Sequence, residues 1–262
     1  MAATTGIRTT EGWVPNARTE SIFGRVSAQE FVGDVDWDAA VARLAPPPMP
    51  DYVRSQIHGI EGGYGTTLAA ATWDPVVREI FAEYGLDEAS VRDGLAARAP
   101  AGARRILDVA CGTGESTRAW RRRFPEAEIV AFDVSPFMAA VAERKLARDR
   151  RTQIRCLDAE AMPFEDGSFD VVTTSLLFHE LPAEVAPGVA AEMARVCRRG
   201  GALAVLEPYE KGGPALSPIP FPEPYLKDFL AADWDAIFGA AGFTGIAFES
   251  FEIGWMRTAT RA

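Results

Sequence analysis

Cysteine and histidine are scarce in this chain of 262 residues, and long apolar runs are absent. The three cysteines, Cys111, Cys156 and Cys197, stand too far apart for a CxxC metal or redox motif. No stretch of 18 or more apolar residues occurs, which excludes a membrane-spanning helix. The first residues lack a basic stretch followed by an apolar one, so we expect no secretory signal. Together these absences predict a cytoplasmic protein with reduced thiols and no membrane partner.

Basic residues are outnumbered by acidic ones, which limits the partners. The chain has 27 Lys and Arg against 37 Asp and Glu, a net charge of −10. Because non-specific binding to nucleic acid depends on neutralising phosphates, this balance argues against a nucleic-acid partner. A composition of 48% apolar and 24% charged residues is typical of a globular protein. We expect a small-molecule substrate, and the oligomeric state stays open between a monomer and a homodimer.

The chain divides into two parts of different pattern near residue 100, giving expected domains of 1–100 and 101–262. The second part alternates short apolar runs with helical stretches, which indicates βαβ units and a parallel sheet. Its last two apolar runs leave no room for a crossover helix and so predict an antiparallel hairpin. We therefore expect an α/β fold, a doubly wound, Rossmann-like sheet of seven strands with five parallel strands and a C-terminal antiparallel hairpin. These strands are expected at 106–110, 128–132, 152–156, 169–174, 201–207, 243–248 and 252–258.

The first part, residues 1–100, is predicted to be a mostly helical cap over the ligand-binding edge of the sheet. Asp74 followed by Pro75 has the form of an N-cap with proline at the first helical position, and predicts a helix that starts there. Before it, glycines surround Tyr64 and would let the backbone approach a ligand closely. Further helices are expected at 37–44 and 88–97.

The strongest local motif is ILDVACGTG at residues 106–114, an apolar strand that ends in a glycine turn. It is not the GxGxxG dinucleotide motif, because the third glycine would fall on Thr117. Taken alone, such a turn is as compatible with a plain strand-to-helix connection as with a ligand site. Asp133 and Asp158, however, follow the next two expected strands. Since parallel strands end at one edge of a sheet, these acids and Asp108 are expected to meet at one crevice.

These motifs, together with DAEAMPF at 158–164, GSFD at 167–170, FHEL at 178–181 and RVCRRGG at 195–201, resemble class I S-adenosylmethionine-dependent methyltransferases. The resemblance is to the small-molecule branch that includes the ubiquinone and menaquinone biosynthesis methyltransferases. It covers residues 104–208 closely and 230–258 by strand pattern only. It implies S-adenosylmethionine as the cofactor, and nothing in it resembles the acid pattern of the metal-dependent catechol branch, so no metal is expected.

The resemblance also implies a role for each residue of the cofactor site. The turn through Ala110, Gly112 and Gly114 would pass the methionine part of the cofactor, and Ala110 stands where many members carry glycine. Asp108 would reach the amino group of that part. Asp133, with its neighbour Val134, would hold the ribose. Asp158 and the backbone of Ala159 would hold the adenine, and the residues around Ser175 would line the sulfonium end.

The candidate catalytic residues are His179, His58 and Tyr64. His179 follows the fourth expected strand and could act as a base, or it could brace a loop. His58 and Tyr64 lie in the cap among glycines and aromatic residues, and we expect them to face the acceptor beside the methyl group of the cofactor. His58 could equally be a structural histidine. The proline-rich stretch 208–224 is expected to be a loop over the substrate, with an inert surface loop as the alternative.

The function expected is transfer of a methyl group to a small molecule by in-line displacement in a capped pocket, with quinone-type chemistry as one possibility. The nucleophilic atom, O, N or C, is not indicated. Two alternatives remain. One is a regulator that binds the cofactor, or a cyclase that does not transfer its methyl group. The other is a NAD-dependent oxidoreductase, which the missing third glycine disfavours.

Overall fold

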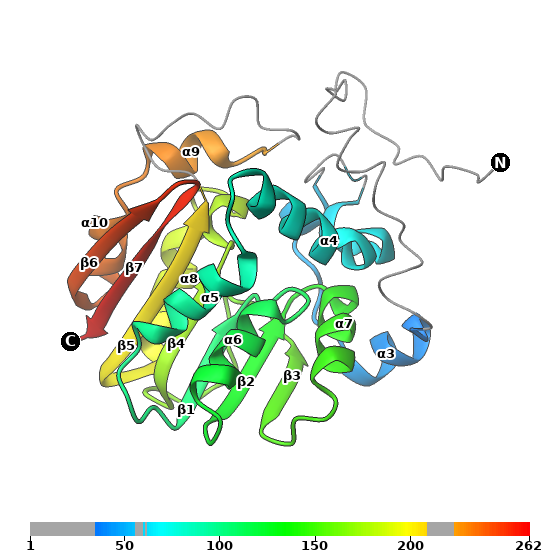
Figure 1. Cartoon of the computed structure of the whole chain (residues 1–262), viewed down its shortest axis with the longest axis horizontal. Coiled ribbons are helices and arrows are strands. Elements are labelled where there is room, and N and C mark those ends of the chain that lie inside the picture. The colour runs from blue at the N-terminus through cyan, green and yellow to red at the C-terminus, as the bar shows by residue number, and fades with distance from the viewer. Residues whose placement is uncertain (1–34, 56–59, 61, 209–222) are drawn as a thin grey trace.

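The computed structural model describes residues 35–55, 60, 62–208 and 223–262. Within this part of the chain, no helix is long and apolar enough to cross a membrane. A single seven-stranded sheet runs through the molecule in the order β3-β2-β1-β4-β5-β7-β6 (Figure 1). Its strands are β1 (Arg105–Val109), β2 (Glu128–Asp133), β3 (Thr152–Cys156), β4 (Phe169–Ser175), β5 (Cys197–Pro208), β6 (Phe243–Phe251) and β7 (Gly254–Arg261).

The pairing of the strands is the one predicted. β1 to β5 pair in parallel, β7 pairs antiparallel with β5, and β6 pairs antiparallel with β7. The strand order reverses direction between β1 and β4, which lie side by side. In an open α/β sheet, the crevice outside the carboxyl ends of the strands at such a reversal is the usual place for a ligand.

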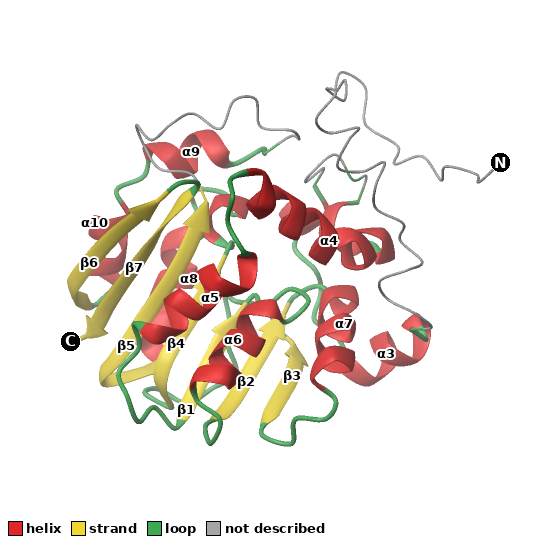
Figure 2. Ribbon diagram, viewed as in Figure 1, coloured by secondary structure: helices red, strands yellow, loops and turns green. Residues whose placement is uncertain are grey.

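Helices cover both faces of the sheet (Figure 2). The alternation of side chains along a strand sends Ile106 to one face and Leu107 to the other. On the first face lie α5 (Glu88–Ala97), α6 (Glu115–Arg123) and α7 (Pro136–Leu146), and on the second lie α8 (Ala186–Val196) and α10 (Trp234–Ala241). Burial on both faces explains why β1, β4 and the second half of β5 are buried at nearly every residue rather than at alternate ones.

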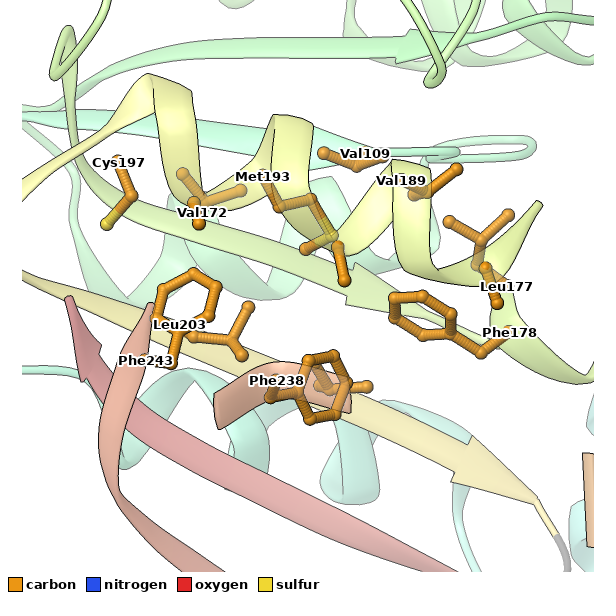
Figure 3. Close-up of a cluster of buried hydrophobic side chains, with 14 of the residues drawn as sticks. Val109, Val172, Leu177, Phe178, Val189, Met193, Cys197, Leu203, Phe238 and Phe243 are labelled. Carbon is orange, nitrogen blue, oxygen red and sulfur yellow. The ribbon is translucent and has the colours of Figure 1, made fainter. Parts of the chain in front are cut away.

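The larger core lies on the face of α8 and α10. Val189 and Met193 of α8 pack against Val172 of β4, and Phe238 and Phe243 pack against the same cluster (Figure 3). Phe178 joins it directly after β4, with its ring centroid 5.4 Å from that of Phe238 at an angle of 77°. This packing fixes the loop that carries residues 178–180, one of the predicted site motifs.

The remaining helices belong mainly to the part before the sheet. They are α3 (Trp37–Leu44), the 3-10 helices η1 (Asp51–Arg54) and η2 (Gly63–Gly65), α4 (Thr67–Glu83), the 3-10 helix η3 (Phe178–Glu180) and α9 (Leu226–Ala231). We call the described residues from 35 to 84 the cap segment. Its alanines at 69–71 pack against Met138 and Val141 of α7. In Figure 1, α4 lies beyond the carboxyl ends of the strands, where the cap was expected.

One helix start was predicted wrongly. Asp74 and Pro75 do not open a helix but lie inside α4, which begins at Thr67. Thr66 is the N-cap, since its Oγ1 accepts a hydrogen bond from the backbone N–H of Ala69 at 3.1 Å. Pro75 removes one backbone hydrogen bond from the helix interior, and the helix continues because its neighbours Thr72, Val76 and Val77 are buried.

The packing also bears on the expected boundary at residue 100. α5 shares a buried cluster with α6 and the sheet, in which Leu95 and Ala96 contact Ile106 and Trp120. The helix thus packs on the sheet through these residues, although Arg92 of the same helix reaches the cavity. A division by packing therefore falls before α5, while the domains 1–100 and 101–262 stay a prediction.

Candidate active site

A cavity opens at the carboxyl ends of β1, β2, β3 and β4, under the cap segment. Its empty volume is about 900 Å³, including space open to solvent. It is lined by Tyr52, Val53, Tyr64, Trp73, Arg92, Ala110, Cys111, Gly112, Thr113, Glu115, Ser116, Phe132, Asp133, Val134, Met138, Leu157, Asp158, Ala159, Ser175, Leu176, Leu177, Glu180 and Leu181. Seven of the nine predicted cofactor residues are in this set; Asp108 and Gly114 lie behind it.

The turn after β1 needs its glycines. Gly112 has φ 55° and Gly114 has φ 90°, in the left-handed region that favours glycine. A side chain at Gly114 would also meet the Cβ of Ala142 at 3.2 Å and Leu146 Cδ1 at 3.3 Å. Ala110, with φ 53°, takes the same backbone conformation without being glycine. The turn therefore brings bare backbone to the cavity wall.

Asp108 lies behind the turn, fully buried. Its Oδ2 accepts a hydrogen bond from Thr117 Oγ1 at 2.6 Å, and its Oδ1 has no partner among the described residues. Burial raises the pKa of Asp108 to about 7, against the opposing effects of Thr117 and Arg92. Thr117 fills the position of the third dinucleotide glycine with a hydrogen-bonding side chain, which disfavours the oxidoreductase alternative further.

Asp133 ends β2 and faces the cavity. Its Oδ2 accepts from the backbone N–H of Gly112 and its Oδ1 from that of Ser135, both at 2.9 Å. Burial raises the pKa of Asp133 to about 6, although these backbone bonds oppose the shift. Each carboxylate oxygen has two lone pairs, so one remains on each for a ligand.

The other predicted cofactor residues follow along the same edge. Asp158 lies beyond β3, with its Oδ1 accepting from the backbone N–H of Glu160 at 2.9 Å. Val134 and Ala159 line the cavity beside it. Ser175 ends β4, and its buried Oγ has no hydrogen-bond partner among the described residues.

Tyr64 reaches the cavity from the cap segment. Its hydroxyl donates to Glu180 Oε1 at 2.6 Å, and its backbone carbonyl accepts from Ser135 Oγ at 2.6 Å. Burial and the neighbouring carboxylate of Glu180 raise the pKa of Tyr64 well above its ordinary value. The phenol is therefore neutral and its proton is committed to Glu180. The other cap residue of the prediction, His58, lies outside the described residues, as does nearly all of the 208–224 loop.

His179 lies behind Glu180 rather than on the cavity wall. Its Nδ1 is 2.7 Å from Glu207 Oε2, and its Nε2 is 3.5 Å from Glu180 Oε1. Burial alone would lower the pKa of His179, but the carboxylates of Glu207, Glu180 and Glu223 outweigh it and raise the pKa to about 9. The ring is thus an imidazolium at neutral pH. This arrangement suits the bracing alternative better than the base, and a catalytic role for His179 stays a prediction.

Three residues of this site were not among the predicted ones. Arg92 is 5% exposed, and it lines the cavity from α5 while donating to Ser116 Oγ at 2.5 Å and Glu88 Oε1 at 2.8 Å. In the sequence, Glu88 and Arg92 have the spacing of an ordinary exposed helix pair. Glu180 and Glu207 were missed because only the structure brings the ends of β4 and β5 together around His179.

The cap segment is joined to the cavity wall at two further points. Tyr52 OH donates to Glu160 Oε1 at 3.0 Å, beside Asp158. Asp74 accepts a hydrogen bond from Thr113 of the glycine turn and forms an ion pair with Lys145 of α7. The cap therefore contacts the wall at both ends of the cavity and at the turn between them.

Sheet order and strand-end cavity together define a class I methyltransferase fold. Comparison with known proteins agrees: the family model described as "Methyltransferase domain" matches residues 106–201. Residues 106–201 therefore match a methyltransferase domain, and the predicted resemblance to class I S-adenosylmethionine-dependent methyltransferases is confirmed over this part of the chain.

Two curated relatives give the measure of this similarity. The chain is 44% identical over 107 residues to the demethylmenaquinone methyltransferase of Thermus thermophilus, covering 40% of this chain and 47% of that protein. It is 40% identical over 121 residues to the ubiquinone/menaquinone biosynthesis C-methyltransferase UbiE of Dinoroseobacter shibae, covering 45% and 48%. The chain thus spans about half the length of the curated relatives it matches.

Solved structures share the fold at low identity. Human N-acetylserotonin methyltransferase in complex with SAM has a TM-score of 0.59 at 14% identity, covering 85% of this chain and 62% of that one. The [4+2]-cyclase SpnF has a TM-score of 0.54 at 20% identity, covering 74% and 96%. At these identities the likeness concerns the fold alone.

Proposed function

We propose that this protein transfers a methyl group from S-adenosylmethionine to a small, quinone-type acceptor. The observation that carries the proposal is a cavity at the β1/β4 reversal, which unites the glycine turn, Asp133, Asp158 and Ser175 under the cap segment. The quinone class is suggested by the names of the curated relatives and by the apolar wall of Leu176, Leu177 and Leu181.

The residues fit the amino-acid part of this cofactor. Asp108 Oδ1 is a buried oxygen with no partner among the described residues, which suits an ammonium group. Arg92 is a buried guanidinium at the same end of the cavity, which suits a carboxylate. The anionic Asp108 and the cationic Arg92, both near the glycine turn, thus match the ammonium and the carboxylate of an amino acid.

The nucleoside part fits the next two strand ends. Asp133 has lone pairs available for the two hydroxyls of a ribose, because its present bonds use only one per oxygen. Asp158 and the backbone of Ala159 would hold the adenine edge, and Tyr52 would cover it from the cap segment. The sequence of groups along the sheet edge is then that of the cofactor itself.

Bound in this way, the cofactor supplies an electrophilic methyl group on a sulfonium. The chain's own contribution is to hold the acceptor in line with that methyl group and to keep water out of the cavity. Tyr64 and Trp73 close the cavity from the cap segment, with ring centroids 5.4 Å apart in an edge-to-face contact. His179, His58 and Tyr64 remain the proposed catalytic residues, with Tyr64 the one whose hydrogen bond at the cavity is described.

The partners and location form part of the same proposal. We infer a cytoplasmic protein from the few, widely spaced cysteines, and no nucleic-acid partner from the acidic balance of the sequence. The oligomeric state stays open between monomer and homodimer. No metal is proposed for the methyl transfer.

The test has two arms. Calorimetry should show binding of S-adenosylmethionine and S-adenosylhomocysteine by the wild-type chain. Asp133→Ala should weaken both by about one to two orders of magnitude, because buried hydroxyls would lose their acceptor. Unchanged affinity in the variant would place the ribose elsewhere.

The second arm measures transfer of a labelled methyl group to compounds of a metabolite extract and to demethylated quinones. A labelled quinone product supports the proposal. Tight cofactor binding without any transfer would favour the cyclase or regulator instead. Titration with NADH, followed by nicotinamide fluorescence, is the control for the oxidoreductase and should show no binding.

A further inference from the structure

The polar groups of the cavity wall are arranged in the order of the strands. Asp158 follows β3, Asp133 ends β2, the glycine turn follows β1 and Glu180 follows β4. Because neighbouring strands are about 4.8 Å apart, the ends of β3 and β4 are separated by roughly 14 Å. Glu180 therefore lines the cavity from the strand next to the glycine turn, on the side away from Asp158.

Glu180 is a carboxylate held in place by its neighbours. It is 6% exposed, accepts the hydroxyl proton of Tyr64, and lies beside the imidazolium of His179. Glu207 in turn fixes this loop, because its Oε1 accepts from the backbone N–H groups of Leu177 at 2.9 Å and Phe178 at 2.7 Å. The carboxylate of Glu180 thus points at the cavity with little freedom to move.

The described charges around Glu180 are mainly negative. His179 is in contact with Glu180 and Glu207. A carboxylate oxygen of Glu223 lies within 4.8 Å of a ring nitrogen of His179 and of a carboxylate oxygen of Glu180. Three carboxylates therefore surround one imidazolium. In a buried site of low dielectric, such a group of charges attracts a cation from the cavity.

Aromatic rings complete this end of the cavity. Tyr64 and Trp73 both line it, and Trp73 Nε1 lies 3.6 Å from where a Cβ on Gly112 would be. Tyrosine and tryptophan rings are the aromatic groups that commonly surround cationic centres, sulfonium and ammonium included. The wall therefore has both features of a cation site, next to the turn that takes the amino-acid part.

We propose that Glu180, positioned by Tyr64 and His179, recognises the positive charge of the sulfonium and makes the cavity discriminate S-adenosylmethionine from its uncharged product. The inference rests on the proposed function. When the carbon–sulfur bond breaks, its electron pair stays on sulfur and the sulfonium becomes a neutral thioether. The attraction to Glu180 is then lost, and S-adenosylhomocysteine dissociates more readily than S-adenosylmethionine, although the two share their other contacts.

The chain provides a matched control at the other end of the cavity. Tyr52 and Glu160 form a second tyrosine–glutamate pair between the cap segment and the wall, with an O–O distance of 3.0 Å. It lies beside Asp158, at the proposed adenine end of the cavity. Glu160→Gln should therefore change the affinities for charged and uncharged ligands by the same factor.

The experiment measures the Kd of three probes by calorimetry. They are S-adenosylmethionine, S-adenosylhomocysteine and sinefungin, which carries an amine in place of the sulfonium methyl. In Glu180→Gln, the affinities for the two charged probes should fall about tenfold relative to S-adenosylhomocysteine. Tyr64→Phe, which frees Glu180 to move, should shift the same ratio about threefold in the same direction. A ratio is insensitive to any unfolded fraction, so partial unfolding of a variant cannot imitate the effect.

Three results are decisive. A charged-to-uncharged ratio that moves in Glu180→Gln and not in Glu160→Gln supports the inference. A ratio unchanged within twofold in both Glu180→Gln and Tyr64→Phe, or one that moves equally in Glu160→Gln, overturns it while leaving the proposed function intact. If the wild-type chain binds none of the probes, the proposed function fails and the inference with it.

Discussion

The sheet and the cap segment are held together by different means. The larger buried cluster of the sheet draws on six of the seven strands and on helices α8, α9 and α10, and it includes fully buried Phe169, Phe178 and Phe238. The cap rests on α7 through a smaller cluster that includes three alanines, and Val77 and Phe81 of α4 form another small cluster with Ile253. Polar links to the cavity wall add to these contacts, at Tyr52, Tyr64 and Asp74.

The difference shows which part of the molecule can move without unfolding the rest. Apolar burial stabilises by about 25 cal/mol per Å², so an alanine contact contributes much less than a phenylalanine contact. Polar links across a water-accessible cavity can be exchanged for bonds to water. We therefore expect the cap to open at a lower free energy than the sheet, as segments around ligands commonly do.

The largest expected effect belongs to the sheet. Trp120 of α6 is 1% exposed and stacks on Phe124 with ring centroids 6.0 Å apart. Trp120→Ala should lower the free energy of unfolding by about 3–5 kcal/mol, measured by urea denaturation, because it leaves a large cavity. Leu68→Ala in the cap is the counterpart. It should speed hydrogen exchange in α4 while hardly changing the midpoint of urea denaturation. If Leu68→Ala instead lowered the free energy of global unfolding as much as it lowered the local stability of α4, the cap would not open separately from the sheet.

The second prediction concerns pH. Burial raises the pKa of Asp108 to about 7 and that of Asp133 to about 6. The ligand-free folded protein therefore retains protons that the unfolded chain has released, so its free energy of unfolding should fall as the pH rises from about 4 to about 7.

Cofactor affinity should move in the opposite direction, since an ammonium group binds the ionised Asp108. With a pKa of about 7, the ionised fraction increases roughly 20-fold between pH 5.5 and 7.5. The affinity for S-adenosylhomocysteine, measured by calorimetry, should increase by a similar factor. Asp108→Asn should flatten this part of the profile; a variant with the wild-type profile would contradict the assignment.

The third prediction tests the link between cap and glycine turn. Asp74→Asn breaks the ion pair with Lys145 and weakens the bond from Thr113, so hydrogen exchange in α4 should show a loss of about 1–3 kcal/mol of local stability. The exposed Asp38→Asn on α3 is the control and should have no such effect. S-adenosylhomocysteine should also slow hydrogen exchange in α4 less in Asp74→Asn than in Asp38→Asn.

The smallest effect is expected at the surface of the cap. Arg43 and Glu143 form an ion pair between α3 and α7, with side-chain exposures of 56% and 34%. Arg43→Ala should change stability by less than about 1 kcal/mol, because water and salt screen exposed pairs. A larger loss in a thermal melt would mean that α3 holds the cap more firmly than its packing indicates.

The sequence predicted the sheet better than the cap for a physical reason. Strand, turn and acid repeat within a few residues in the sheet, so local patterns alone place Asp133 and Asp158 at one edge. The cap depends on contacts between distant residues. Asp74 had the local form of a helix N-cap, yet its carboxylate bonds to Thr113, and α4 starts at Thr67.

Parts of the candidate site could not have been predicted either. Arg92 looks like half of an exposed helix pair until α5 is placed over α6. Glu207 ends a strand well separated in the chain from His179, and only the pairing of β4 with β5 joins them. Tyr64 was placed at the cavity from the glycines around it, and its partner Glu180 required the fold.

Ser135 has a kinetic consequence. Its backbone N–H holds Asp133, the proposed ribose ligand, while its hydroxyl donates to the backbone carbonyl of Tyr64 in the cap. One residue thus joins the nucleoside site to the segment that completes the acceptor side. We therefore expect an ordered binding, in which the cofactor enters before the acceptor. S-adenosylhomocysteine would then compete with S-adenosylmethionine for the free enzyme, and not with the acceptor.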